Sequence, residues 1–256
     1  MSKSDRILFA AKFAGLHAFC TLFIALAVAA AIFYFWYPYP YGELSGGREL
    51  FAMIFVVDVI CGPLLTFILV SPKKAKREIF GDMCLVVLIQ FSALAYGTWT
   101  AWQARPSYLV LEVDRFKVVS LSALDPLAIK ALPSDLSPSI FGGVKVVALR
   151  PPLSVEEKNK VLFESFELGR DYSVRPEFYV PYQGAAAIKS LERAVSLEKF
   201  LNSYPNQRAE AERVADKFGE NIVNLKYIPV VGRSDWVALL RSDGSILGFL
   251  EGDGFF

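Results

Sequence analysis

The chain has 256 residues, of which 54% are apolar and 14% aromatic, and its formal net charge is +1 at pH 7. An ordinary soluble domain is about 45–50% apolar, and the excess here lies before residue 104. The near balance of charges argues against a basic surface for nucleic acid. A single histidine, His17, and three cysteines argue against a zinc site, a disulfide framework or a redox cysteine pair.

Three long apolar stretches cover about residues 13–36, 50–70 and 83–102. Each reaches the ~20 residues that a helix needs to cross a bilayer. Backbone groups find no water there, so we expect helices. The sequence therefore predicts an all-α membrane domain with three transmembrane helices over residues 1–103, followed by an α+β globular domain outside the cytoplasm, residues 104–256. The first stretch exceeds the ~7–15 apolar residues of a signal-peptide core, which favours an uncleaved helix.

Positive charges set the predicted orientation, because short loops rich in Lys and Arg stay in the cytoplasm. The N-terminal tail and the loop 71–77 are basic, whereas the loop 37–49 carries one cation, Arg48. We therefore expect the N-terminus and the loop 71–77 in the cytoplasm and the C-terminal domain in the periplasm. The basic loop is explained by this topology signal and by anionic lipids, with a cytoplasmic protein as the alternative.

Aromatic residues cluster where the first and third apolar stretches are expected to leave the membrane. Such rings prefer the interface, where one part of the ring is dry and the other wet. We expect the following residues to form a belt at the outer membrane interface: Tyr34, Trp36, Tyr37, Tyr39, Tyr41, Trp99 and Trp102.

Asp58 is the most unusual residue of the second apolar stretch. Counted along a helix it lies ~12 Å below the outer face, where a carboxylate costs ~2.5–3.5 kcal/mol on insertion scales. Gly62 and Pro63 follow it at helical spacing. Because Pro63 has no N–H to give to the carbonyl of Val59, we expect a freed backbone acceptor and a kink near Asp58.

Depth counting along the predicted helices suggests neighbours for the polar residues. Gln90 and Asp58 differ in depth by ~6 Å, and His17 matches the depth of Thr66. We therefore predict that Asp58 lies near Gln90 and that His17 lies near Thr66. One interpretation is that these residues form hydrogen bonds between the helices, each of which stabilises the helix packing by about 0.6 kcal/mol. Alternatively, they contact the membrane helix of a partner or translocate protons, although a single acid is a poor pathway.

The region after Trp102 reads as mixed α and β. Alternating β-branched and aromatic residues predict a strand pair or one long strand over 108–121, and further strands over 143–149, 227–232 and 236–249. A hairpin turn is predicted in the last segment, where Asp243-Gly244 suits type I′. Ser154 and Glu157 have the spacing of a capping box, so a helix is expected from there to about Leu168, closed by Gly169. Further helical stretches are predicted over 185–201, in one piece or two, and over 206–218.

Carboxylates are available in this domain for catalysis, namely Asp114, Glu164, Glu167 and Asp171. Paired carboxylates could serve a glycosidase. However, the glutamates recur at helical spacing that is typical of a solvated face, and the domain has no histidine or cysteine. We therefore expect no enzyme activity, no catalytic or cofactor-binding residue, no metal site and no cofactor.

Taken together, these features resemble the type IV pilin accessory proteins called TfpX/TfpZ. The resemblance covers most of the chain and rests on the order and spacing of short motifs rather than on any one of them. The markers are Tyr37-Pro38-Tyr39-Pro40, Asp58 with Gly62-Pro63-Leu64-Leu65-Thr66, Asp82 with Gln90, Arg105-Pro106 and Asp114-Arg115-Phe116.

The resemblance implies a non-enzymatic accessory protein or chaperone in the bacterial inner membrane. It would assist the stability of the major type IV pilin or its assembly into pili, with membrane lipids and other pilus assembly proteins as further partners and no nucleic acid. The resemblance implies a partner pilin that lies in the membrane as a single helix with a globular head outside. It also implies a buried carboxylate near the start of that pilin helix. The candidate partner-binding residues are Asp58, Gly62, Pro63, Thr66, Gln90, Asp114 and Arg115.

Two other classes of function remain open. One is a membrane-anchored sensor or receptor whose periplasmic domain binds a small ligand and signals through a partner, since the segments expected inside the cell are short. The other is a membrane enzyme or small transporter, which the lack of outer histidines and of several intramembrane ionisable groups argues against.

Overall fold

The computed structural model describes residues 3–167 and 169–256, which form two compact units. One unit comprises Met1–Tyr34 and Gly47–Gln103, and we call it the helical unit. The other comprises Phe35–Gly46 and Ala104–Phe256, and we call it the α/β unit. The chain thus enters the α/β unit twice, first through a short segment and later through its C-terminal half.

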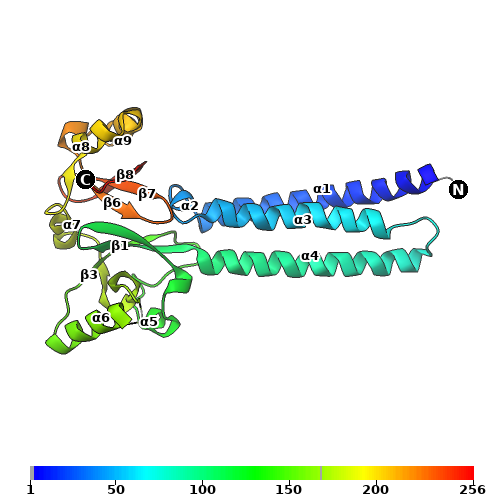
Figure 1. Ribbon diagram of the computed structural model, residues 1–256, viewed down its shortest axis with the longest axis horizontal. Helices are drawn as coiled ribbons and strands as arrows, with labels where there is room; N and C mark the ends of the chain where they lie inside the picture. Colours follow the sequence, from blue (N-terminus) through cyan, green and yellow to red (C-terminus); the bar gives the residue numbers. More distant parts are fainter. Residues whose placement is uncertain (1–2, 168) are drawn as a thin grey trace. The chain divides into compact units, whose positions relative to one another are not determined.

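Three long helices build the helical unit: α1 (Lys3–Phe35), α3 (Gly47–Leu69) and α4 (Lys76–Ala104). The helix α3 runs antiparallel to α1 and α4 (Figure 1). In the loop before α4, the Lys74 ammonium pairs with the Asp82 carboxylate at 2.6 Å, so Asp82 neutralises one of the loop's cations.

The prediction of three transmembrane helices is wrong. Within the described chain, two helices are long and apolar enough to cross a membrane, Ser4–Phe35 and Lys76–Ala104. In α3 the apolar helical segment found among the described residues is Asp58–Leu69, which spans only ~18 Å. This segment is shorter than the ~20 residues that a transmembrane helix needs. The two remaining spans are consistent with membrane anchoring.

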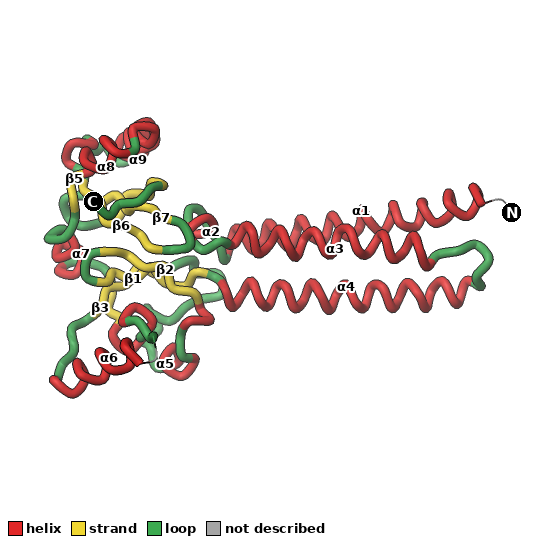
Figure 2. The backbone as a smooth tube through the Cα atoms, in the orientation of Figure 1, coloured by secondary structure: helices red, strands yellow, loops and turns green. Residues whose placement is uncertain are grey.

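A single mixed sheet forms the centre of the α/β unit (Figure 2). Its described strands are β1 (Pro106–Glu112), β2 (Arg115–Ser120), β3 (Lys145–Leu149), β4 (Tyr179–Pro181), β5 (Val195–Ser196), β6 (Lys226–Val231), β7 (Asp235–Leu240) and β8 (Ile246–Glu251). The strand order is β4-β3-β1-β2-β6-β7-β8, with β5 pairing β6. The pairs β1·β3 and β2·β6 are parallel, and the other pairs are antiparallel. Of the two alternatives for residues 108–121, the strand pair is confirmed.

Short helices cover this sheet. They are α5 (Pro126–Lys130), α6 (Val155–Glu167), α7 (Ala185–Ser190), α8 (Leu197–Ser203) and α9 (Arg208–Lys217), with 3-10 turns η1 (Leu121–Ala123), η2 (Tyr172–Val174), η3 (Pro176–Phe178), η4 (Pro205–Gln207) and η5 (Ile222–Asn224). Tyr227 of β6 packs with α8 and α9, whereas its neighbour Ile228 belongs to a different core cluster. This alternation is what a strand covered on both faces requires.

Of two local predictions in this unit, one is confirmed and one is wrong. The helical stretch expected over 185–201, in one piece or two, forms two helices, α7 and α8, with the short strand β5 between them. The turn at Asp243-Gly244 is not type I′, because that turn needs positive φ at both central residues and of these two only Gly244 has it, at 81°. Asp243 instead accepts a hydrogen bond from the Ser245 N–H at 2.8 Å.

The first segment of the α/β unit, residues 35–46, is folded into that unit's core. Its helix α2 (Tyr41–Leu44) buries Leu44 completely, and the Arg233 N–H donates to the Leu44 carbonyl at 2.6 Å. A Cβ on Gly232 would lie 2.4 Å from that carbonyl oxygen, so glycine permits the close approach. Tyr37 is only 4% exposed, and burial raises its pKa to about 12. Tyr37 therefore lies inside this unit rather than in the expected belt.

Candidate partner-binding site in the helical unit

One polar cluster joins all three helices of the helical unit. His17 of α1 makes two hydrogen bonds, one through Nδ1 to Thr66 Oγ1 of α3 at 2.5 Å and one through Nε2 to Gln90 Oε1 of α4 at 2.6 Å. Thr66 is fully buried. The predicted proximity of His17 and Thr66 is confirmed. Gln90 lies at the centre of the candidate span Lys76–Ala104, so the cluster sits deep within the apolar part of the unit.

Gln90 also connects α4 to α3. Its amide Nε2 donates to the main-chain carbonyl of Asp58 at 2.9 Å, which confirms the predicted proximity. The contact depends on Gly62, because a Cβ there would lie 1.9 Å from Gln90 Nε2. One turn of α3 thus supplies both the Asp58 carbonyl as acceptor and, at Gly62, the space for the Gln90 amide to reach it. Pro63 lies next to Gly62 inside α3 and supplies no N–H to this region.

The Asp58 carboxylate is the member of this cluster without a partner. The sequence suggested that Gln90 would satisfy it, but Gln90 binds the main chain instead. The Asp58 residue is only 6% exposed. Within the part of the chain that the structure describes, no residue donates a hydrogen bond to its carboxylate. A carboxylate without a partner in apolar surroundings is costly, so Asp58 is a candidate contact for another molecule.

A small cavity of ≈ 120 Å³ opens beside Asp58. Its walls come from α1 and α4, and Asp58 is the lining residue from α3. The lining residues are His17, Cys20, Thr21, Ile24, Ala25, Asp58, Val87, Gln90, Phe91 and Leu94. Apolar walls around a few polar groups are the usual make-up of a binding site. Sequence reasoning found the polar residues by depth but missed the walls, because their facing positions follow from helix packing.

Asp114 and Arg115, the other predicted site residues, lie in the α/β unit at the hairpin between β1 and β2. Their side chains pair at 2.8 Å and are about half exposed. The hydrogen bond from Arg115 holds the pKa of Asp114 below its usual value. The Arg115 guanidinium also lies 4.8 Å from the centre of the Phe255 ring. Val113, at the tip of this hairpin, is 74% exposed and has a φ of 47°, which is strained for a β-branched residue.

A larger groove of ≈ 550 Å³ runs beside this hairpin tip. Its floor is apolar, with Leu111 and Val180, and its cationic lining residues are Arg150, Lys189 and Arg193. Sequence reasoning missed this groove, because its walls come from strands and a helix that are distant in the chain.

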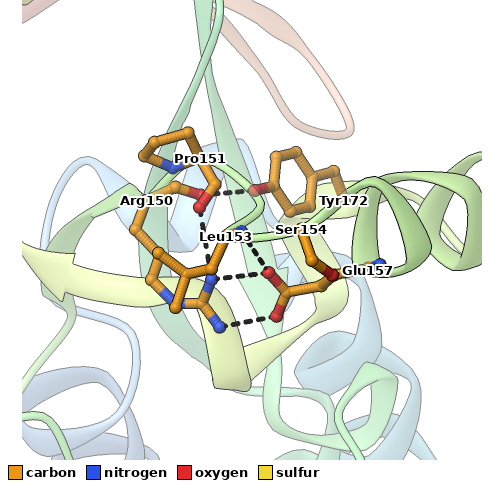
Figure 3. A network of polar contacts seen from close by, with 6 residues as sticks. All are labelled: Arg150, Pro151, Leu153, Ser154, Glu157 and Tyr172. Atoms are coloured by element: carbon orange, nitrogen blue, oxygen red, sulfur yellow. Dashed lines mark hydrogen bonds and ion pairs between the residues drawn. The ribbon is translucent and has the colours of Figure 1, made fainter.

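Beside this groove, a polar network fixes the start of α6 (Figure 3). Arg150 makes two parallel hydrogen bonds to Glu157, at 2.8 and 3.0 Å. The Glu157 carboxylate also accepts from the Leu153 N–H at 2.6 Å, and the Glu157 N–H donates to Ser154 Oγ at 3.0 Å. The Arg150 guanidinium and the Leu153 N–H hold the pKa of Glu157 at about 2. The predicted N-cap Ser154 is confirmed, although Glu157 reaches Leu153 rather than Ser154.

Besides Asp114, two more of the carboxylates considered for catalysis are held in ion pairs. Glu164 pairs with Arg175 at 2.6 Å, and Arg175 is only 1% exposed. Asp171 pairs with Lys117 of β2. Among the described residues, no three His, Cys, Asp or Glu side chains gather as a set of metal ligands. These two ion pairs therefore help to attach α6 and the segment that follows it to the rest of the unit.

Comparison with known proteins agrees with an assembly function. The family model for "Fimbrial assembly protein FimB" matches residues 5–46, which cover most of α1 and all of α2. The chain is 34% identical over 257 residues to a fimbrial assembly protein, serogroup I, of Dichelobacter nodosus, covering 98% of each chain. A serogroup E1 protein of the same organism is 33% identical over 98% of each chain. No solved structure matches. This chain belongs to the FimB family of fimbrial assembly proteins.

Proposed function

We propose that this chain is a non-enzymatic accessory protein of the bacterial inner membrane that assists the assembly of type IV fimbriae by binding the major pilin. Family membership supports the role in fimbrial assembly, and two candidate spans support the membrane location. The narrower likeness to TfpX/TfpZ proteins stays a prediction. Other assembly proteins and membrane lipids are further partners in this proposal.

The cavity beside Asp58 is the observation that carries the proposal. A helix that packs along the outside of α1 and α4 could place an apolar side chain in this cavity, against Ile24 and Leu94. It would also have to bring a cation or a hydrogen-bond donor to Asp58. A pilin helix with a buried carboxylate near its start would be repelled by Asp58 unless one acid is protonated or a cation lies between them. The free amino group of a processed pilin supplies such a cation.

In this proposal the α/β unit contacts the globular head of the pilin. The hairpin tip with Asp114 and Arg115 offers both charges on an exposed turn. Lys189 and Arg193 beside it favour an acidic surface on the partner. Opposite charges of this kind set orientation and on-rate more than affinity.

The proposed orientation places the loop 71–77, which leads into the span Lys76–Ala104, in the cytoplasm and the α/β unit in the periplasm. The basic residues of that loop support this orientation. In this arrangement the helical unit meets the pilin helix within the bilayer, and the α/β unit meets the pilin head outside it.

A clean deletion in the native host tests the function. Total pilin in the membrane and fimbriae sheared from the surface would both be measured. Fewer surface fimbriae with membrane pilin retained would indicate a role in assembly, and loss of both would indicate a stabilising chaperone. If neither changed, the proposal would be wrong.

The sensor alternative is favoured by one specific observation, the groove of ≈ 550 Å³ in the α/β unit. This volume is in the range of small-molecule sites. The alternative predicts that Lys189→Glu together with Arg193→Glu alters signalling through a partner while a fimbriated host keeps normal fimbriae. The assembly proposal predicts fewer fimbriae in the same variant.

A further inference from the structure

The loop of residues 138–143, which precedes β3, exposes two large apolar side chains. Ile140 is 52% exposed and Phe141 is 70% exposed. The loop contains no charged residue, and its sequence ends in Gly142-Gly143. The fimbrial role proposed above does not use this loop, and the glycine pair is too short for a phosphate loop.

Two contacts tie this loop to the places where the candidate membrane spans end. The Phe141 ring packs edge-on against Phe35, with ring centroids 5.0 Å apart, and Phe35 is the last residue of the span Ser4–Phe35. Arg105 Nη1 donates to the Ser139 carbonyl at 2.9 Å, and Arg105 directly follows the span Lys76–Ala104. Both spans therefore end beside the same loop.

The depth of the loop in a bilayer follows from these contacts. A helix that crosses the hydrocarbon ends near the headgroup region. Phe35 must lie at about that level, and the side chain that touches it lies within a few ångströms of the same level. Arg105 is only 5% exposed. Its guanidinium therefore contacts the loop and is not accessible to lipid phosphates.

We propose that this loop inserts Ile140 and Phe141 into the interfacial region of the bilayer, as a third point of attachment beside the two spans. Aromatic and aliphatic side chains without nearby charge favour the boundary between headgroups and acyl chains. The occupant of this surface is therefore the lipid itself. Because the loop carries no cation, its insertion needs no anionic lipid, in contrast to basic segments. The inference rests on membrane anchoring and not on the fimbrial role.

A fluorescent label at position 141 tests this inference in the full chain. Cys20, Cys61 and Cys84 are replaced with alanine, Phe141→Cys is introduced, and an environment-sensitive NBD dye is attached. The control is Val223→Cys, which is 70% exposed on η5. Both proteins are reconstituted into phosphatidylcholine vesicles, with and without phosphatidylglycerol, that contain lipids with nitroxide quenchers at defined depths.

The inference predicts blue-shifted emission at position 141 and quenching several-fold stronger than at position 223, strongest for a nitroxide near the headgroups and equal in both vesicle types. Emission and quenching like those of the control would overturn it. Blue-shifted emission without lipid quenching would also overturn it, because the loop would then be covered by protein, such as a second copy. Quenching only in vesicles with phosphatidylglycerol would show electrostatic adsorption instead.

Discussion

The two units of this chain hold their most buried charged residues in different ways. In the α/β unit, Arg175 is almost completely buried but is paired with Glu164, and Arg150 is paired with Glu157. In the helical unit, Asp58 is nearly as buried, yet no described residue donates to its carboxylate. Paired groups of the first kind hold segments in place. An unpaired group beside a cavity is what a binding site for another molecule requires.

The helical unit nevertheless satisfies its other polar side chains. His17, Thr66 and Gln90 bond to one another, and Gln90 also reaches a main-chain carbonyl. Such bonds between membrane helices contribute only about 0.6 kcal/mol each, so they serve more to fix the register of the helices. The three helices are thereby held in one arrangement, in which Asp58 lines the cavity.

Removing the buried guanidinium should have the largest effect on stability. Arg175→Ala breaks the pair with Glu164 and the hydrogen bond to the Arg170 carbonyl at 3.2 Å. We expect the free energy of unfolding of the α/β unit to fall by about 3 kcal/mol, measured by chemical denaturation of the full chain in detergent. Arg175→Lys should restore only part of the loss, because lysine lacks the planar fork. Full stability in the lysine variant would contradict a geometric role.

Crowding the contact between α3 and α4 should have the next largest effect. Gly62→Ala would place a Cβ 1.9 Å from Gln90 Nε2 and displace the amide from His17 and Asp58. We expect a loss of about 1–3 kcal/mol, seen as a lower thermal midpoint in detergent. Gly81→Ala on α4 is the matched control, since a Cβ there meets no atom within 4 Å.

A double-mutant cycle sharpens this prediction. If the clash with Gln90 is the cause, Gly62→Ala should cost much less when Gln90 is already alanine. An equal cost in both backgrounds would show that Gly62 acts through some other contact.

Removing the helix cap of α6 should have a smaller effect. Ser154→Ala deletes the acceptor for the Glu157 N–H and should cost about 1 kcal/mol, whereas Ser154→Gly should cost only a few tenths. Chemical denaturation of both variants measures the difference. Equal losses for the two substitutions would argue against a capping role.

The smallest expected effect is a change in how the stability of the chain depends on pH, caused by the ion pair between Arg150 and Glu157. The pKa of Glu157 is lowered from 4.5 to about 2 in the folded chain, chiefly by the hydrogen bond from Arg150. The stabilisation is present above pH 4.5 and is lost as the pH falls through 2, because the unfolded chain binds the proton first. As the pH falls from 4.5 to about 2, the free energy of unfolding should therefore decrease less steeply in Glu157→Gln than in the unmodified chain. Parallel curves for the two proteins would contradict the pairing.

Residues that act through short, regular spacing were predicted well. The capping residue Ser154 followed from local spacing, and the neighbours of His17 and Gln90 followed from the constant rise of a helix. Counting along the sequence fails where distant segments meet. Residues 35–46 contain prolines and glycines typical of a loop, but Leu44 is buried in the core of the α/β unit, a position that only the folded sheet creates.

Counting along the sequence also failed for the number of transmembrane helices and for the partners of charged and polar side chains. The stretch 50–70 satisfied a count of apolar residues, but the apolar segment found in α3 among the described residues, Asp58–Leu69, is too short to cross a bilayer. Glu164 had the spacing of a solvated helix face, yet it pairs with the buried Arg175, which lies beyond the end of α6. Likewise, Gln90 reached the main chain of Asp58 rather than its carboxylate, because the exact rotation of packed helices is not contained in depth alone.

The central claim is that the cavity beside Asp58 receives the pilin helix, and site-specific photocrosslinking in the native host tests it most directly. A photoreactive residue is placed at Ile24, which lines the cavity, or at its neighbour Phe23, which is 69% exposed and not among the lining residues. We predict a pilin adduct from position 24 and not from position 23, lost in Asp58→Asn although the protein still accumulates. An equal yield from both positions, or a yield unaffected by Asp58→Asn, would contradict the account.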